Sequence, residues 1–256
     1  MSTVATLTEA IERITSGSTI GIGGSPTTRK PIALVRELAA SDVTDLHLVS
    51  FTGSVGIDLL VGSGSVASVA SGYMGLGHFG RAPNFVAAVE SGSVEDREYS
   101  EWLLLQRIRA AAMGVPFIPT RAAVGSQIAD LHSFVRMTDP YSGDVVLALP
   151  PLELDVTLIH AWRASESGYV QFAEPPDHLW DIDVTMARAS NEVIVSVDEV
   201  VADDVIAAAP HLTQLFPVDV TTIVESLNGA WPTASRPTHG EDADALRQYA
   251  ASGVLP

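Results

Sequence analysis

Apolar residues follow two patterns along most of this chain. Short, nearly continuous apolar runs, such as residues 156–161, predict β-strands that are buried on both faces. Between these runs, apolar residues recur every three or four positions, as they do within residues 32–38, which predicts amphipathic helices. Strands are predicted at residues 18–23, 46–50, 66–70, 94–99, 156–161 and 192–197, and helices at residues 8–14, 31–40, 57–61, 84–91, 101–113 and 182–189. Because strands alternate with helices, we expect an α/β fold with an open, mostly parallel, doubly wound sheet.

Two regions do not follow this alternation. Residues 122–142 contain glycine, proline and polar residues and are expected to form a loop or a hairpin. Residues 230–256 contain three prolines and show little periodicity, so we expect an irregular tail that packs on the body or on a partner chain. A chain of 256 residues is long enough for one large core. We therefore predict a single domain, residues 1–229, followed by the tail.

The composition limits what the chain can bind. The formal net charge is −17, and Lys30 is the only lysine. Nucleic-acid binding needs a basic surface and an anionic membrane would repel this chain, so neither partner is expected. No apolar run reaches the length of a membrane span, and residues 1–12 lack the pattern of a signal peptide. The absence of cysteine excludes disulfides and a thiolate nucleophile and suits the cytoplasm, where we expect the protein. Because only 18% of the residues are charged, we expect a partner chain to cover part of the surface.

A glycine-rich turn, residues 21–31, joins one predicted strand to the next helix. Gly23 and Gly24 allow positive φ angles and a close approach of the backbone to a ligand, and the N–H groups at the helix start could hold an anion. The turn lacks the third glycine of a dinucleotide-binding fingerprint and the Gly-Lys-Ser/Thr of a phosphate-binding loop. It is either a tight strand-to-helix turn or part of a ligand site, and the neighbouring cations Arg29 and Lys30 favour the ligand site. Replacing Gly24 with valine is then expected to lower turnover and to leave the fold intact.

Eight segments form an ordered set along the chain. They are residues 21–38, 45–49, 58–62, 72–85, 98–101, 109–121, 155–161 and 167–171. In this order they resemble the α subunit of the family I CoA-transferases, in particular the glutaconate CoA-transferase branch. None of the segments is decisive alone, but the ordered set is specific, and it covers roughly residues 5–205.

The resemblance implies an open α/β fold that pairs with a related β subunit, as a heterodimer or a heterotetramer, with the active site between the chains. The substrate would be a coenzyme A thioester, and no cofactor would be permanently bound. In these transferases a β-subunit glutamate attacks the acyl-CoA, and a mixed anhydride and a glutamyl-CoA thioester then carry CoA to an acceptor acid. This chain is therefore not expected to carry the nucleophile. Glu90 and Glu166, which each precede Ser-Gly, are interpreted as surface turn residues.

Glu101 is the candidate catalytic residue of this chain. It follows a predicted strand and opens a predicted helix, and ligands of doubly wound sheets bind beyond the carboxyl ends of the strands. Ser100 is a candidate N-cap, so helix capping explains this pair as well as catalysis does. The same branch includes an actinobacterial steroid-degradation enzyme that hydrolytically opens a ring of a CoA thioester without transferring CoA. The resemblance implies that this enzyme acts through an α-subunit glutamate near this segment, and Glu101 is the best match here.

CoA transfer is the leading prediction, because residues 75–80 resemble the transferases more than the hydrolase. Ring-opening hydrolysis is the alternative, and a non-enzymatic acyl-CoA-binding or sugar-phosphate-sensing module is the third. A partner chain with an intact Glu-x-Gly-x-x-Gly motif favours transfer, a partner without that glutamate favours hydrolysis, and the lack of any partner favours the module. The histidines have no metal-ligand spacing, so no metal site is expected. The predicted substrate- or CoA-binding residues are Gly23, Gly24, Ser25, Arg29, Gly77, His78 and Ser100.

Overall fold

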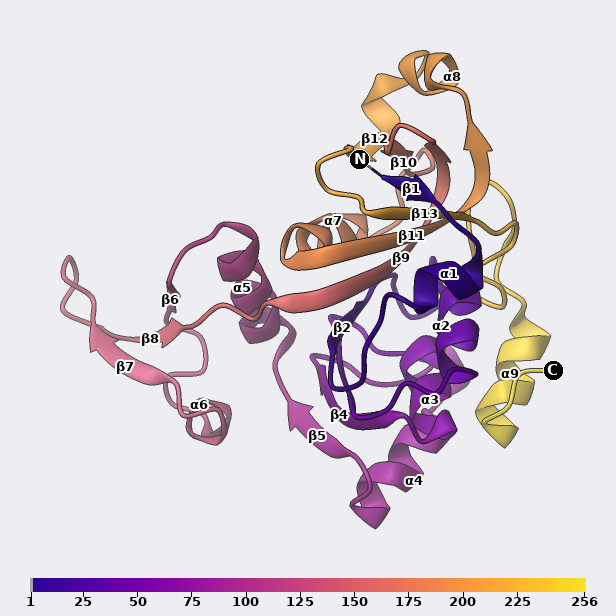
Figure 1. The fold of residues 1–256 in the computed structure, drawn as a ribbon. Helices are drawn as coiled ribbons and strands as arrows, with labels where there is room; N and C mark the ends of the chain where they lie inside the picture. Colours follow the sequence, from indigo (N-terminus) through magenta and orange to yellow (C-terminus); the bar gives the residue numbers. More distant parts are fainter. Residues whose placement is uncertain (1) are drawn as a thin grey trace.

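The computed structural model describes residues 2–256, and a 10-stranded sheet forms the centre of this part of the chain (Figure 1). Most of its strands lie side by side with parallel neighbours. In order across the sheet these are β1 (Thr3–Val4), β13 (Thr222–Glu225), β11 (Ser190–Val201), β9 (Leu154–Ser165), β2 (Thr19–Ile22), β3 (Leu46–Ser50), β4 (Val66–Ser71) and β5 (Glu95–Glu98). Two short antiparallel strands, β10 (Val170–Gln171) and β12 (Thr213–Leu215), extend the sheet beside β9.

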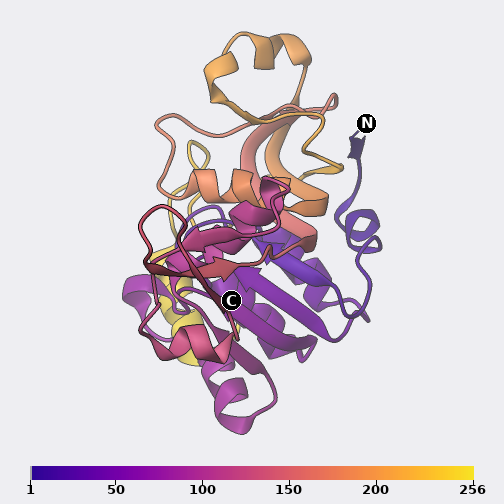
Figure 2. The same cartoon turned by 90° about the vertical axis from the view of Figure 1, so that its left-hand side faces the viewer.

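Helices cover both faces of the sheet (Figures 1 and 2). One face packs against α1 (Leu7–Ile11), α2 (Ile32–Ala39), α3 (Val55–Ser63) and α4 (Pro83–Ser91). The other face packs against α5 (Glu101–Ala112) and α7 (Trp180–Arg188). The inward side chains of the core strands are apolar on both faces, which is why their sequences read as continuous apolar runs. The predicted doubly wound α/β fold is therefore confirmed.

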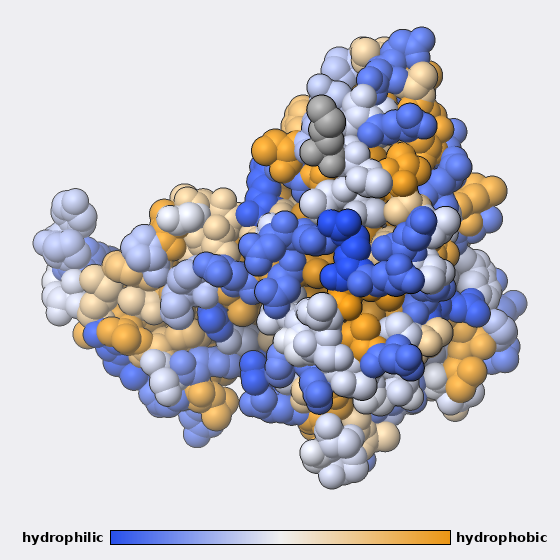
Figure 3. Space-filling model, in the orientation of Figure 1, coloured by the Kyte–Doolittle hydropathy of each residue, from blue (hydrophilic) through white to orange (hydrophobic). Residues whose placement is uncertain are grey.

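A small three-stranded antiparallel sheet forms an arm that projects from the body (Figures 1 and 3). Its strands are β6 (Ile118–Thr120), β8 (Val145–Leu149) and β7 (Val135–Thr138), and α6 (Gln127–Leu131) precedes β7. The region predicted as a loop or hairpin thus contains a short helix and the first strand of a hairpin. Val135, Tyr141 and Val145 on this arm are exposed.

The tail corrects one expectation from the sequence. Instead of being irregular throughout, it forms the helix α9 (Ala243–Ser252), with Asp242 as N-cap. The hydroxyl of Tyr249 on α9 donates a hydrogen bond of 2.7 Å to the buried carboxylate of Asp58 on α3. A helix of this length has only a narrow apolar stripe, so its stability depends on packing against the body, which the local pattern does not reveal. Among residues 2–256, no helix combines the length and the apolar content that a membrane crossing requires.

The chain order of the strands reverses between β2 and β9. From β2 the chain builds the sheet outward through β3, β4 and β5, and it then returns to place β9, β11 and β13 on the other side. Ligands of doubly wound folds commonly bind at such a reversal, beyond the carboxyl ends of the strands. The carboxyl ends of β2 to β5 and of β9 are therefore where a site is expected. The elements α8 (Asp203–Ala207) and the one-turn helix η2 (Pro210–Leu212) lie beyond β11, away from α9 (Figure 1).

Candidate active site

The glycine turn after β2 is buried, and its N–H groups are occupied within the chain. The N–H of Gly23 donates to the carbonyl of Leu158 at 2.9 Å, and that of Gly24 to Oδ1 of Asp183 at 2.8 Å. In the first turn of α2, the N–H of Ala33 donates to the carbonyl of Gly229 at 2.8 Å. These three N–H groups already have partners within the chain, which argues against an anion at this turn. Their partners lie far away in sequence, so the turn alone could not reveal them.

Arg29 lies inside this turn between two carboxylates. Its Nε donates to Asp177 at 2.7 Å, its guanidinium also contacts Asp183, and its side chain is 6% exposed. The guanidinium lies 5.1 Å from the ring centre of Phe172. Ser25 is also fully buried, with its hydroxyl against that of Thr28. These positions favour a structural role for the turn residues over direct contact with a ligand.

The reversal point between β2 and β9 is closed by the tail and by a buried polar network. The backbone of Ala234 in the tail pairs with the turn through hydrogen bonds of 2.7 Å from Arg29 and 2.8 Å to Thr27. Behind it, His160 on β9 is fully buried, with Nδ1 2.9 Å from the hydroxyl of Ser196. A ligand therefore cannot enter here without displacing protein, so the open part of the sheet edge lies toward β4 and β5.

Burial keeps His160 uncharged, and the protein is expected to lose stability as the pH falls below about 6.5. Burial lowers the pKa of His160 below its usual value, and this outweighs the opposing influence of Asp198. Between the two pKa values the unfolded chain binds a proton that the folded chain does not, so the free energy of unfolding falls by up to about 1.4 kcal/mol per pH unit. Urea unfolding at pH 7.5, 6.5 and 5.5 measures this slope. His160→Gln is expected to flatten it, whereas His78→Gln, at an exposed histidine, is expected to leave it unchanged. An equal slope in all three proteins contradicts the assignment.

Glu101 stands exposed at the open part of the sheet edge. It is the first residue of α5, and the hydroxyl of Ser100 caps this helix by accepting the N–H of Leu103 at 3.3 Å. Gly72, directly after β4, packs against it so closely that an added Cβ would lie 2.6 Å from Cα of Glu101. The capping prediction for Ser100 is thus confirmed. Because Gly72 has no side chain, the backbone of Glu101 can pack directly against it, and this contact places the start of α5.

The loops after β3 and β4 are joined to each other at the same edge. The N–H of Gly53 donates to the carbonyl of Tyr73 at 2.7 Å, and the N–H of Gly75 donates to Gly53 at 3.3 Å. Trp102 directly follows Glu101, and Tyr73 directly follows Gly72, which packs against Glu101. Tyr73 and Trp102 are 38% and 52% exposed. A carboxylate beside exposed aromatic side chains suits an acyl group better than a polyphosphate.

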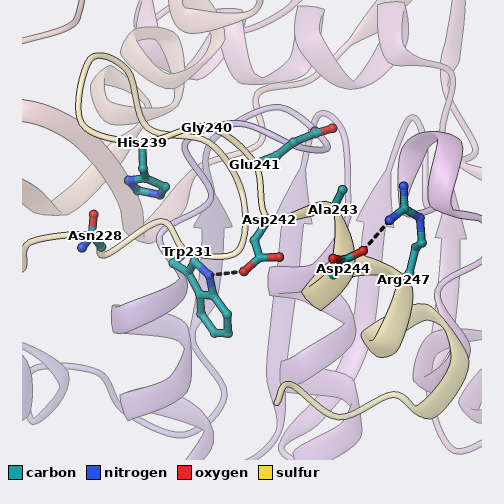
Figure 4. Close-up of a pocket in the computed structure, with 9 residues that line it drawn as sticks. All are labelled: Asn228, Trp231, His239, Gly240, Glu241, Asp242, Ala243, Asp244 and Arg247. Atoms are coloured by element: carbon teal, nitrogen blue, oxygen red, sulfur yellow. Dashed lines mark hydrogen bonds and ion pairs between the residues drawn. The ribbon is translucent and has the colours of Figure 1, made fainter.

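Gly77 and His78 lie on a different flank of this edge, in the one-turn helix η1 (Gly77–Phe79). The imidazole of His78 is largely exposed, and its Nε2 lies 3.7 Å from Oε1 of Glu241 in the tail. Glu241 belongs to a pocket of about 680 Å³ that is lined almost entirely by the tail, including the start of α9, and is shown in Figure 4. Its lining residues are Asn228, Trp231, His239, Gly240, Glu241, Asp242, Ala243, Asp244 and Arg247. The pocket carries three carboxylates, and its one arginine is paired with Asp244, so it does not fit the phosphates of CoA.

The structure thus groups the predicted residues into three neighbouring sets rather than one cluster: the buried glycine turn, the flank of His78, and the pair Ser100 and Glu101. Sequence reasoning missed two residues: Gly72, which positions Glu101, and Asp183, which positions the glycine turn. Gly72 had a signal, because a glycine directly after a strand often marks a close approach. Within residues 2–256, no three histidine, aspartate or glutamate side chains are placed to share a metal ion.

A comparison with protein families matches residues 4–226 to the coenzyme A transferase model. The chain belongs to the coenzyme A transferase family. Among curated members, the IpdA subunit of a cholesterol ring-cleaving hydrolase from Rhodococcus jostii is 32% identical over 98% of this chain and 86% of that protein. A glutaconate CoA-transferase subunit from Acidaminococcus fermentans is 30% identical over 97% of this chain and 82% of that protein.

Solved structures of coenzyme A transferase relatives share the fold across nearly the whole chain. The glutaconate coenzyme A-transferase of Acidaminococcus fermentans superposes with a TM-score of 0.91 at 28% identity, covering 98% of this chain and 84% of that chain. A variant of the decarboxylase AibA/AibB superposes with a TM-score of 0.88 at 32% identity, covering 99% of this chain and 94% of that chain. Relatives at similar identity therefore carry names for CoA transfer, ring cleavage and decarboxylation. Family membership leaves the reaction to be argued from the site.

Proposed function

We propose that this chain is the α subunit of a two-chain enzyme that acts on acyl-CoA thioesters, and that its reaction is CoA transfer. The observation that carries the proposal is the openness of the candidate site: Glu101, Trp102 and Tyr73 are all exposed at the sheet edge. A reactive anhydride or thioester intermediate must be kept from water, so a second chain has to cover this edge. The names of the relatives, which are subunits of larger enzymes, support the same arrangement.

The nucleophile would come from the second chain. Glu90 and Glu166 are the two glutamates of this chain that precede Ser-Gly, and both are exposed. Glu90 lies in the last turn of α4, which leads into the start of β5 and therefore lies at the opposite, amino edge of the sheet. Glu166 lies in the turn between β9 and β10. Neither is placed beside Glu101, which supports a carboxylate nucleophile on the partner.

Ring-opening hydrolysis of a cyclic acyl-CoA is the second candidate, and the position of Glu101 favours it. A carboxylate at the mouth of the site can take a proton from water as the water attacks a carbonyl carbon of the substrate. Gly72 allows the start of α5 to pack closely against the end of β4. The backbone that carries the Glu101 side chain therefore has a defined position. The similarity to the ring-cleaving hydrolase supports this candidate. In CoA transfer, the same carboxylate would only line the site.

Reconstitution with the partner chain tests the proposal. The neighbouring reading frame is expressed together with this chain, and the purified complex is given a panel of linear and cyclic acyl-CoA thioesters, with and without short carboxylic acids. Mass spectrometry then follows new acyl-CoA, free CoA and ring-opened product. We expect the complex to form a new acyl-CoA from the added acid, and this chain alone to show less than about 1% of that rate. Full activity of this chain alone contradicts the two-chain proposal, and binding without turnover by the complex would favour a non-enzymatic acyl-CoA-binding module.

A further inference from the structure

The only lysine of the chain is completely buried at the candidate site. Lys30 is 0% exposed and lies between the glycine turn after β2 and the loop after β3. An ammonium group has three N–H donors and strongly prefers water, so its burial requires an acceptor for each donor. Three backbone carbonyls accept from Nζ of Lys30: Gly23 at 3.0 Å, Gly24 at 2.8 Å and Thr52 at 2.7 Å.

These carbonyls belong to two different loops. Gly23 and Gly24 directly follow β2, whereas Thr52 follows β3, so Nζ joins the loops after two neighbouring strands. The two charged side chains that act on this ammonium are Asp183, which stabilises its charge, and Arg29, which opposes it. The hydroxyl of Ser50 lies 3.4 Å from Nζ but donates its own proton to the carbonyl of Ile22. Among residues 2–256 Lys30 forms no ion pair, and the three carbonyls are the shortest of its polar contacts.

A continuous set of contacts leads from this lysine to Glu101. Lys30 fixes Thr52, and the N–H of the next residue, Gly53, donates to the carbonyl of Tyr73 at 2.7 Å. Tyr73 directly follows Gly72, whose missing side chain leaves room for the backbone of Glu101. The ammonium group is therefore connected to the start of α5 through two loop contacts.

We infer that Lys30 is a positioning residue of the acyl-CoA site. Its ammonium group ties the loop after β3 to the glycine turn. The loop after β3 then holds Tyr73 and Gly72 in the positions that place Glu101. The inference rests on the proposed function. Lys30 does not touch substrate in this arrangement. Its effect is expected in turnover rather than in substrate affinity, because it places the loops that face the reacting group.

The protonation state of the lysine supplies a readout that a purely structural role would not give. Burial lowers the pKa of Lys30 to about 7. Below that pH the ammonium donates to all three carbonyls, whereas above it the neutral amine has only two N–H donors and one carbonyl loses its partner. We therefore expect kcat of the complex to fall as the pH rises above about 7, with KM changing less than about threefold.

Because this chain has a single lysine, its expression in a lysine auxotroph supplied with 4-thialysine changes position 30 alone. The thialysine amine has nearly the same shape as lysine and is less basic. Complexes of the untagged partner with the wild-type, thialysine and Lys30→Met chains are compared for kcat, KM and the fraction folded, using an acyl-CoA that the wild-type complex turns over. ¹⁵N-labelled lysine gives one side-chain signal from this chain, which reports the titration of Lys30 directly.

We expect the thialysine complex to keep the wild-type kcat at low pH and to move the fall in kcat to lower pH. Lys30→Met is expected to lower kcat at least tenfold per folded molecule and to remove the pH break. If Lys30→Met does not fold, the thialysine complex carries the test alone. A pH profile that is unchanged in the thialysine complex overturns the positioning role while leaving the proposed function in place. Absence of turnover by the wild-type complex overturns both.

Discussion

Glu101→Gln is expected to lower the turnover of a ring-opening hydrolase about 10²- to 10⁴-fold, because that is the usual contribution of a general base. In a CoA-transferase the same change is expected to cost less than about tenfold, since the essential carboxylate then lies on the partner chain. The substitution keeps the size of the side chain and removes only its charge. Ser100 still caps α5, so the free energy of unfolding is expected to fall by no more than about 1 kcal/mol. The rate of the reconstituted complex with its best acyl-CoA measures the difference.

Glu90→Gln is the matched control for this experiment. Glu90 is also an exposed glutamate on a helix, and it precedes Ser-Gly, but it lies at the amino edge of the sheet. Turnover is expected to be unchanged in either reaction. A second complex carries the substitution of the glutamate in the partner's own motif. Full activity of the Glu101 variant leaves this residue with a role at the helix start alone, and loss of activity in the Glu90 variant contradicts the assignment of the edge beyond β4 and β5 as the site.

Gly24→Ala is expected to lower the free energy of unfolding by at least about 3 kcal/mol, a large part of the stability of an ordinary domain. Gly24 has a φ of 79°, a left-handed conformation that costs a residue with a Cβ roughly 1–2 kcal/mol. The added methyl group would also lie 2.4 Å from the carbonyl oxygen of Arg29, so the backbone of the turn must move. The structure therefore contradicts the expectation that Gly24→Val leaves the fold intact. Urea unfolding of the purified chain or complex measures the loss.

Gly64→Ala separates the two causes of this loss. Gly64 ends α3 with a φ of 80°, and an added Cβ there would meet nothing within 4 Å. It should cost only the conformational part, about 1–2 kcal/mol. The difference between the two variants then measures the contact with Arg29. Equal losses in both would mean that the turn around Gly24 relaxes freely, contrary to the buried hydrogen bonds seen there.

The hydrophobic pattern was sufficient to predict the class of fold. Continuous apolar runs in β9 and β11 reflect strands that are covered on both faces, and the alternation with amphipathic helices reflects a chain that crosses from one strand to the next parallel one. The ordered motifs also predicted the family that the match over residues 4–226 shows. At the site, the Ser100 cap joins residues that are close together in sequence, which is why it was accessible to sequence reasoning.

Only the tertiary structure decided which part of the sheet edge is open. The two aspartates that neutralise Arg29 lie about 150 residues away from it, and the tail that closes the reversal point lies still further along the chain. A cation beside a glycine turn looks the same in sequence whether its partner is a ligand or a buried carboxylate. The sequence by itself therefore determined the strands and helices with a clear apolar pattern, whereas α9 and the strands of the arm appeared only in the structure. The fold determined which of those residues are exposed, because burial depends on long-range contacts that have no local pattern.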